Sequence, residues 1–211
     1  MKVAIFTRKM TNSRPLQSSG FTLIELLVVI GIIAIVAGLV VGLSAVAGEK
    51  SKISRAQVER DRLVTLIQSY KSKIGVYPPD HPQNPGRNTL LYELSGAIRN
   101  PPPGNPGYTS PFGSIQSNLL WSAFEARGII NASDDGTDIK RLLKEVKPDQ
   151  VSALVPNTLS LVFPVQDSNG SPKSAWQYLV GTNAVHNPDS FDLWVDIKVR
   201  GQVRTIGNWR N

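Results

Sequence analysis

The segment SSGFTLIELLVVIGIIAIVAGLVVG, residues 18–42, is apolar over most of its length and contains one charged side chain, Glu25. From Leu26 to Ala47 the only hydroxyl belongs to Ser44, and no charge or proline interrupts the run. A helix of this length covers the roughly 30 Å hydrocarbon core of a bilayer at about 1.5 Å per residue. The sequence therefore predicts a membrane-spanning helix over residues 21–48. Because an ionised carboxylate in hydrocarbon costs on the order of 3 kcal/mol, Glu25 requires a partner or a function.

The distribution of charge predicts the orientation of this helix. The chain of 211 residues has a formal net charge of +7, and four of its cations precede Gly20 with no acid among them, namely Lys2, Arg8, Lys9 and Arg14. A basic cluster beside an apolar run marks the cytoplasmic flank, so residues 1–20 are expected inside and the chain beyond residue 48 outside. The remaining cations are scattered, which argues against nucleic-acid binding. With no cysteine in the chain, no disulfide can stabilise the fold.

Beyond the apolar run the pattern becomes amphipathic without a break. Apolar residues recur at spacings of three, four or seven among charged residues, namely Ile53, Ala56, Leu63, Ile67, Tyr70 and Ile74. No proline occurs before Pro78, and Gly75 is a typical helix end. We therefore expect the helix to continue through residues 49–75, for roughly 80 Å in total at 1.5 Å per residue. Its second part needs a domain to cover the apolar stripe.

Residues 76–211 are expected to form that domain. Helical patterns occupy 88–98, 114–128 and 134–148, and the proline-rich segment 99–113 is expected to be an irregular loop. Strand patterns occupy 158–165, 174–181, 191–199 and 202–209. The last two strands meet at Arg200-Gly201, which is a plausible hairpin turn. The predicted fold class is α+β, with a long N-terminal helix packed against a small antiparallel sheet.

A short motif at the start of the long helix identifies a family. Gly20 is followed by Phe21, Thr22, Leu23, Ile24 and Glu25, with a short basic leader before them and a long apolar helix after. This arrangement resembles the N-terminus of type IV pilins and of the pseudopilins of type II secretion systems, closely over residues 14–50 and loosely over the whole chain. The absence of a cysteine pair favours a pseudopilin-like subunit, because many pilins of pathogens close a C-terminal loop with one.

The resemblance implies a defined sequence of events. A prepilin peptidase in the membrane would cut between Gly20 and Phe21 and methylate the new amine of Phe21. The subunit would be a single-pass protein of the bacterial inner membrane with a periplasmic C-terminal domain. With other pilin-like subunits and copies of itself, it would then join a filament at an inner-membrane assembly platform, the long helices lying at the filament's centre.

On this view Glu25 acquires a partner. A carboxylate four residues along a helix from the amine of Phe21 lies on the same face, so the two charges can meet within one chain. In the family the Glu is thought to meet the amine of a neighbouring subunit instead. A second assembly feature is a stripe of small residues four apart, Ala34, Gly38 and Gly42, which lets helices approach closely in lipid. Such residues are also simply common in membrane helices.

Few other side chains suggest a catalytic or metal-binding role, and no enzymatic site is predicted. His81 and His186 are expected to be surface loop residues, and Asp134, Asp135 and Asp138 around Gly136 are expected to form a turn and helix cap. Major pseudopilins often bind calcium near the C-terminus, and the resemblance makes Asp189 and Asp192, with Asp196, weak calcium candidates. The four tryptophans, Trp121, Trp176, Trp194 and Trp209, are expected in the core.

Two alternatives to a filament subunit stay open. SAVAG, residues 44–48, contains an Ala-x-Ala site, so signal peptidase cleavage after Ala47 would release a secreted soluble binding domain. Against this, the apolar run is longer than the usual 7 to 15 residues of a signal peptide, and Glu25 would have no explanation. The second alternative is an anchored periplasmic enzyme, for which no site is visible in the sequence.

Overall fold

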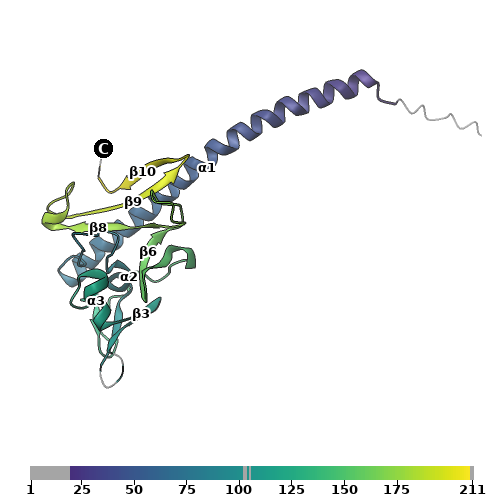
Figure 1. Ribbon diagram of the computed structural model, residues 1–211. Coiled ribbons are helices and arrows are strands. Elements are labelled where there is room, and N and C mark those ends of the chain that lie inside the picture. The colour runs from purple at the N-terminus through teal and green to yellow at the C-terminus, as the bar shows by residue number, and fades with distance from the viewer. Residues whose placement is uncertain (1–19, 102–103, 105, 210–211) are drawn as a thin grey trace, which may run out of the picture. The chain divides into compact units, whose positions relative to one another are not determined.

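The long helix is the main feature of the structure. The computed structural model describes residues 20–101, 104 and 106–209, except for the side chains of residues 39–47. The chain divides into two compact units, Met1–Val46 and Ala47–Asn211, and helix α1 (Leu23–Ile74) belongs to both (Figure 1). The predicted continuous helix is therefore confirmed. Its predicted end is confirmed as well, because Gly75 has a φ of 91° and leaves the helical region.

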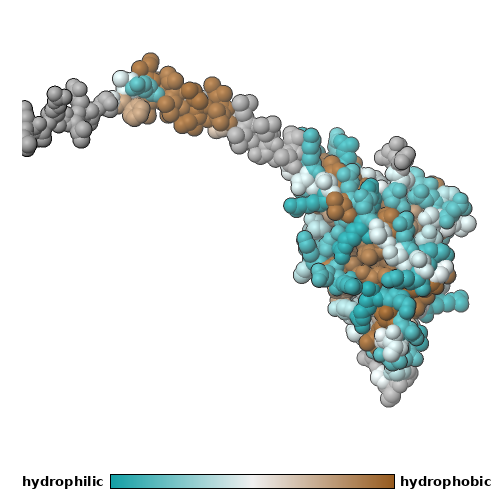
Figure 2. Space-filling model, turned by 180° about the vertical axis from the view of Figure 1, so that it is seen from behind, coloured by the Kyte–Doolittle hydropathy of each residue, from teal (hydrophilic) through white to brown (hydrophobic). Residues whose placement is uncertain are grey.

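The described part of the first unit exposes apolar side chains. The large apolar residues between Leu23 and Val36 are 46–81% exposed, and Figure 2 shows them as a brown surface. Among the described residues, no helix combines the length and the apolar character that crossing a membrane requires.

In the second unit, α1 packs against the domain through the predicted stripe. Ala56, Leu63, Ile67 and Tyr70 are fully buried or nearly so, at spacings of seven, four and three residues. This spacing places them on one face of the helix. They share one hydrophobic core with residues of α2, α3 and the strands, so burial of the stripe holds the helix to the domain.

The rest of the second unit consists of short helices and three small sheets. The helices are α2 (Leu90–Ser95) and α3 (Ser117–Phe124), with 3-10 turns at Pro148–Gln150 and Gly181–Asn183. The first sheet, in the order β3-β2-β1-β4, contains β1 (Ala97–Asn100), β2 (Gly107–Ser110), β3 (Gly113–Gln116) and β4 (Ala132–Ser133). The second, β5-β6-β7, contains β5 (Val151–Val155), β6 (Thr158–Phe163) and β7 (Ser174–Ala175). The third, β10-β9-β8, contains β8 (Gln177–Val180), β9 (Phe191–Val199) and β10 (Gln202–Gly207). All pairs are antiparallel except β1 with β4. The prediction of one small antiparallel sheet is thus corrected to three sheets.

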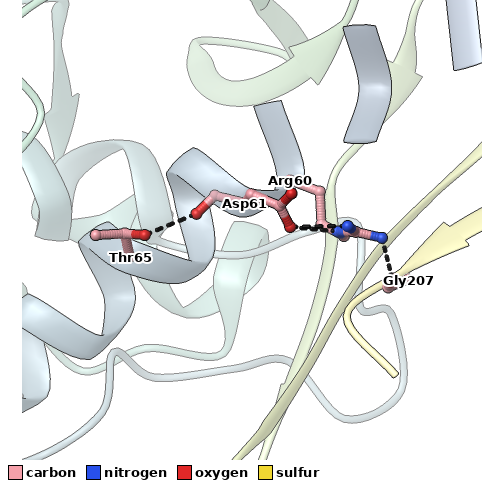
Figure 3. Close-up of polar contacts among 4 residues, drawn as sticks. All are labelled: Arg60, Asp61, Thr65 and Gly207. Carbon is pink, nitrogen blue, oxygen red and sulfur yellow. Dashed lines mark hydrogen bonds and ion pairs between the residues drawn. The ribbon is translucent and has the colours of Figure 1, made fainter. Parts of the chain in front are cut away.

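The third sheet is tied to α1 at both ends of its terminal hairpin. At the turn of the hairpin, Arg200 forms an ion pair with Glu49 of α1. At the end of β10, Arg60 Nη1 donates a hydrogen bond of 2.7 Å to the carbonyl of Gly207, and the same guanidinium pairs with Asp61 at 2.7 Å (Figure 3). These two contacts hold the β9–β10 hairpin against α1, consistent with the position of the third sheet in Figure 1.

The predicted helix over 134–148 is wrong. Residues 134–138 form bends with Gly136 at a φ of 80°, and residues 139–147 have no regular secondary structure up to the 3-10 turn. The backbone amides of Leu142 and Leu143 both donate to the carbonyl of Leu94, and that of Lys140 donates to Asn131 Oδ1. Because neighbouring segments satisfy these amides and Leu143 is buried, the segment needs no helical hydrogen bonds.

The other two predicted helices are shorter than expected. The helix predicted over 88–98 ends at Ser95, where Gly96 has a φ of 71° and a Cβ would lie 2.0 Å from Ile139 Cγ2. The helix predicted over 114–128 is confined to Ser117–Phe124, because the residues before it pair as β3 and Glu125 ends it in the left-handed conformation. The expected irregular loop over 99–113 is also wrong, since the end of β1, all of β2 and the first residue of β3 lie within it.

The C-terminal strands agree better with the sequence. The strands predicted at 158–165, 191–199 and 202–209 are confirmed as β6, β9 and β10, and the one at 174–181 is divided into β7 and β8 at Trp176. The turn at Arg200 and Gly201 is confirmed, with φ values of 50° and 75° that suit a two-residue hairpin. Strand β5 was not predicted. Of the four tryptophans, Trp176 is in the core, Trp194 and Trp209 are half-buried, and Trp121 is 60% exposed.

Candidate functional site

The first turn of α1 is organised around Thr22 and Glu25. Thr22 precedes the helix, and its Oγ1 accepts a hydrogen bond of 3.3 Å from the backbone N–H of Glu25. In return, Glu25 Oε2 accepts hydrogen bonds of 2.8 Å from the backbone N–H and from the hydroxyl of Thr22. This reciprocal pattern is a capping box, in which two amides left unpaired by the start of a helix are satisfied.

The capping box gives Glu25 a partner within the chain. The carboxylate lies in the first turn of the helix, where the exposed amides carry partial positive charge and favour an anion. Only Oε2 is used by Thr22, and Oε1 has no hydrogen-bond partner among the described residues. The cap fixes the position of the carboxylate while one oxygen stays available to a second donor. Pairing of Glu25 with the amine of Phe21 stays a prediction, because that amine exists only after cleavage.

The predicted cleavage site lies immediately before the capping box. Gly20 is exposed, a Cβ added to it would have no atom within 4 Å, and Phe21 is 87% exposed. The Gly20–Phe21 peptide bond is therefore accessible in the described structure. The leader, residues 1–19, lies outside the described residues.

The small-residue stripe lies further along the same helix. Ala34 and Gly38 are exposed on α1, and a Cβ added to Gly38 would have no atom within 4 Å. Gly42 is part of the same helix but lies among the residues whose side chains the structure does not describe.

Two of the three weak calcium candidates, Asp192 and Asp196, have partners within the chain. Asp192 is buried, and its carboxylate accepts hydrogen bonds of 2.8 Å from the backbone N–H of His186 and from Asn187 Nδ2. Asp196 accepts from Gln177 and Thr205, and Asp189 is exposed. In the part of the chain that the structure describes, no group of three or more His, Cys, Asp or Glu side chains could hold a metal ion.

The two histidines differ from each other. His81 is buried, so its predicted surface position is wrong: Nδ1 accepts a hydrogen bond from the backbone N–H of Asn84 and lies 3.5 Å from Glu125 Oε2. His186 is exposed, as predicted, and stacks on Trp209 with ring centroids 3.9 Å apart.

The predicted acidic turn at residues 134–138 is only partly confirmed. The Asp135 carboxylate accepts hydrogen bonds from Ser133 and Thr137, which lower its pKa to about 2, but no helix follows.

A buried carboxylate in the second unit was not predicted. Glu93 of α2 is 0% exposed and accepts hydrogen bonds from Tyr70 Oη at 2.7 Å, the amide of Ile130 at 2.8 Å and the amide of Asn131 at 2.9 Å. Burial raises the pKa of Glu93, and the three donors oppose that rise. Glu93 therefore joins α1, α2 and the segment at 130–131 through a fully buried carboxylate.

The capping box had a signal in the sequence, whereas the contacts of Glu93 had none. Thr22-x-x-Glu25 before an apolar run is the known pattern of a capping box, so the cap was predictable from residue spacing alone. The partners of Glu93 had no such signal, because Tyr70 and Asn131 are 23 and 38 residues away from it in the chain.

Comparison with known proteins finds one family match, and it covers the first turn of α1. Residues 16–41 match the family described as the prokaryotic N-terminal methylation motif. No curated protein and no solved structure is significantly similar to the chain. The match spans Gly20, the capping box and the first part of α1, so the chain carries the N-terminal signature of type IV pilins and pseudopilins.

Proposed function

We propose that this protein is a structural subunit of a type II secretion pseudopilus or of a type IV pilus-like filament. The observation that carries the proposal is the methylation motif at residues 16–41, whose helix begins with a capped carboxylate directly after an exposed Gly20–Phe21 bond. The role is structural, and we assign the chain no enzymatic activity and no cofactor.

The first step is processing. Prepilin peptidase hydrolyses the amide between Gly20 and Phe21, which leaves a carboxylate on Gly20 and a free amine on Phe21. The peptidase then transfers a methyl group to this amine from a sulfonium methyl donor, whose C–S bond breaks, and the amine loses a proton. Exposure of Phe21 and the open space around Gly20 support access of the enzyme to this bond.

The second step is storage in the inner membrane. The exposed apolar side chains between Leu23 and Val36, and the continuation of the apolar sequence to Ala47, support insertion of the first part of α1 into lipid. The basic leader sets the orientation during insertion, before it is removed, with the N-terminus cytoplasmic and the second unit periplasmic. From there, the inner-membrane assembly platform draws the subunit into the filament.

The third step is assembly through Glu25. The cap holds the carboxylate at the helix start and leaves Oε1 without a partner among the described residues. The methylated amine of a neighbouring subunit can then pair with it. This contact neutralises two charges in an apolar filament core and so fixes the register of the added subunit.

Substitutions at Glu25 and Thr22 separate the cap from the charge. Glu25→Gln keeps a side chain that can complete a capping box but removes the negative charge. Thr22→Ala removes the capping hydroxyl but keeps the charge. Filaments are sheared from cells, and the fraction of processed subunit that they contain is measured for each variant.

If charge pairing drives assembly, Glu25→Gln is processed normally, stays in the membrane and is absent from filaments, whereas Thr22→Ala is incorporated. Normal incorporation of Glu25→Gln would show that the carboxylate serves only the cap. An unprocessed wild-type chain would overturn the proposal at its first step.

A further inference from the structure

A basic depression lies beside α1 in the second unit. It has a volume of about 570 Å³ and lies between the first turns of α1 in this unit and the segments at 147–150 and 163–165. Three cations line it, Lys52 and Arg55 from α1 and Lys147 from the segment before the 3-10 turn. The name basic depression is used below for this hollow together with the three cations that line it.

The cations of the basic depression are not neutralised within the chain. All three are exposed, and none forms an ion pair with a carboxylate among the described residues. Of the two acids that line the depression, Glu59 is engaged by Arg62 at 3.0 Å, which leaves Asp149 alone opposite three cations. Like charges that face one open volume favour an anion that enters it.

The position of the basic depression along α1 indicates the kind of anion. Lys52 and Arg55 follow residue 48, the end of the predicted apolar segment, by four and seven residues. At 1.5 Å per residue they lie about 6 and 10 Å beyond it along the helix axis. The polar headgroup layer on each side of a bilayer is about 5–8 Å thick. Lys52 therefore lies at the level of this layer, and the long side chain of Arg55 can reach back to it.

We propose that the basic depression is a phosphate-binding site for anionic lipid headgroups of the periplasmic leaflet. Lys147 lines the same volume as the two helix residues, so a headgroup held there contacts the domain as well as the helix. The bound lipid holds the second unit against the membrane before assembly and is released when the subunit enters a filament. This inference rests on the proposed membrane insertion of α1. A surface of this kind gains about fivefold in binding for each cation near an anionic membrane.

The test uses the full-length chain in lipid nanodiscs. One set of discs contains phosphatidylcholine only, and the other contains phosphatidylglycerol as well. An amine-reactive reagent labels exposed lysines, and mass spectrometry gives the labelling rate of each lysine. Lys52 and Lys147 are expected to react about threefold more slowly in the anionic discs. Lys73 and Lys140, which are exposed and do not line the depression, serve as internal controls with unchanged rates.

Two further arms distinguish a lipid headgroup from free phosphate and from a general effect of charge. Millimolar inorganic phosphate is added to the phosphatidylcholine discs, and equal protection there would overturn the lipid as the source of the phosphate. The triple variant Lys52→Gln/Arg55→Gln/Lys147→Gln is compared with Lys73→Gln/Arg127→Gln/Lys140→Gln, which loses the same charge elsewhere. Amide exchange of residues 147–150 should slow in anionic discs for the wild type and the control variant, and not for the triple variant.

Failure of the inference is distinguishable from failure of the proposed function. A chain that does not co-elute with discs of either composition overturns membrane insertion, and this site with it. A chain that co-elutes with both, but whose Lys52 and Lys147 react equally in both, overturns the lipid site alone.

Discussion

The hydrogen bond between Tyr70 and Glu93 makes a quantitative prediction about how α1 is held to its domain. Tyr70→Phe removes the 2.7 Å hydrogen bond from the tyrosine hydroxyl to a fully buried carboxylate and leaves the two amide donors in place. Hydrogen bonds to charged groups contribute about 1.5–3 kcal/mol. The expected loss in the free energy of unfolding is therefore about 2 kcal/mol where Glu93 is ionised, or roughly a thirtyfold change in the folding equilibrium.

The same substitution has a predicted pH dependence. Burial already raises the pKa of Glu93 above 4.5, and removal of Tyr70 Oη, which lowers it, raises it further. A group with a raised pKa in the folded state contributes stability that is present at low pH and is lost as the pH rises through that pKa. The cost of Tyr70→Phe should thus be smallest below pH 4.5, at about 1 kcal/mol for a neutral hydrogen bond, and should grow as the pH rises.

Urea unfolding of the detergent-solubilised chain, followed by tryptophan fluorescence at several pH values, checks both statements. Tyr77→Phe is the matched control, because its hydroxyl is 3.2 Å from Ser190 and not close to a buried carboxylate. It should cost about 1 kcal/mol or less at every pH. An equal cost of the two substitutions, or a cost of Tyr70→Phe that falls as the pH rises, would refute the assignment of Glu93 as a buried carboxylate that Tyr70 stabilises.

Three further predictions concern the fold that presents the helix. Glu93→Gln should be less stable than the wild type and should flatten the decline of stability above pH 4.5, as measured by urea unfolding; an unchanged decline would assign it to another group. Gly96→Ala should cost at least about 2 kcal/mol, because its Cβ would lie 2.0 Å from Ile139 Cγ2 at a φ of 71°; a wild-type melting temperature would contradict the close approach. Arg60→Gln should speed amide exchange at the end of β10 with a loss of about 1 kcal/mol, since the hydrogen bond to Gly207 is lost, and unchanged exchange would show that this contact is not needed.

The parts of the fold that the sequence predicts correctly are those with a long or regular pattern. Helix α1 follows from an apolar run joined to an amphipathic stripe, and β9 and β10 follow from alternation around Arg200-Gly201. The segment 134–148 was predicted wrongly because Leu142, Leu143 and Val146 have helical spacing. The amides of Leu142 and Leu143 are satisfied instead by the carbonyl of Leu94, and all three side chains pack in or against the core, which no local pattern reveals.

The residues of the candidate site are likewise only partly predictable from the sequence. Gly20, Phe21 and Glu25 are close in sequence, and so the motif that contains them is recognisable without a structure. The physical role of Thr22, which caps the helix and holds the carboxylate in place, was not predicted. Glu93 and His81 could not be identified, because their partners come from distant segments.

The central claim is that the chain is processed at Gly20 and assembled through the helix that follows. The intact mass and N-terminal sequence of the mature protein from native membranes test it most directly. We expect a chain that begins at Phe21 and carries the added mass of one methyl group. A mature chain that begins at Gly48 would contradict the claim, because the apolar segment would then be a discarded signal and Glu25 would have no role in the mature protein.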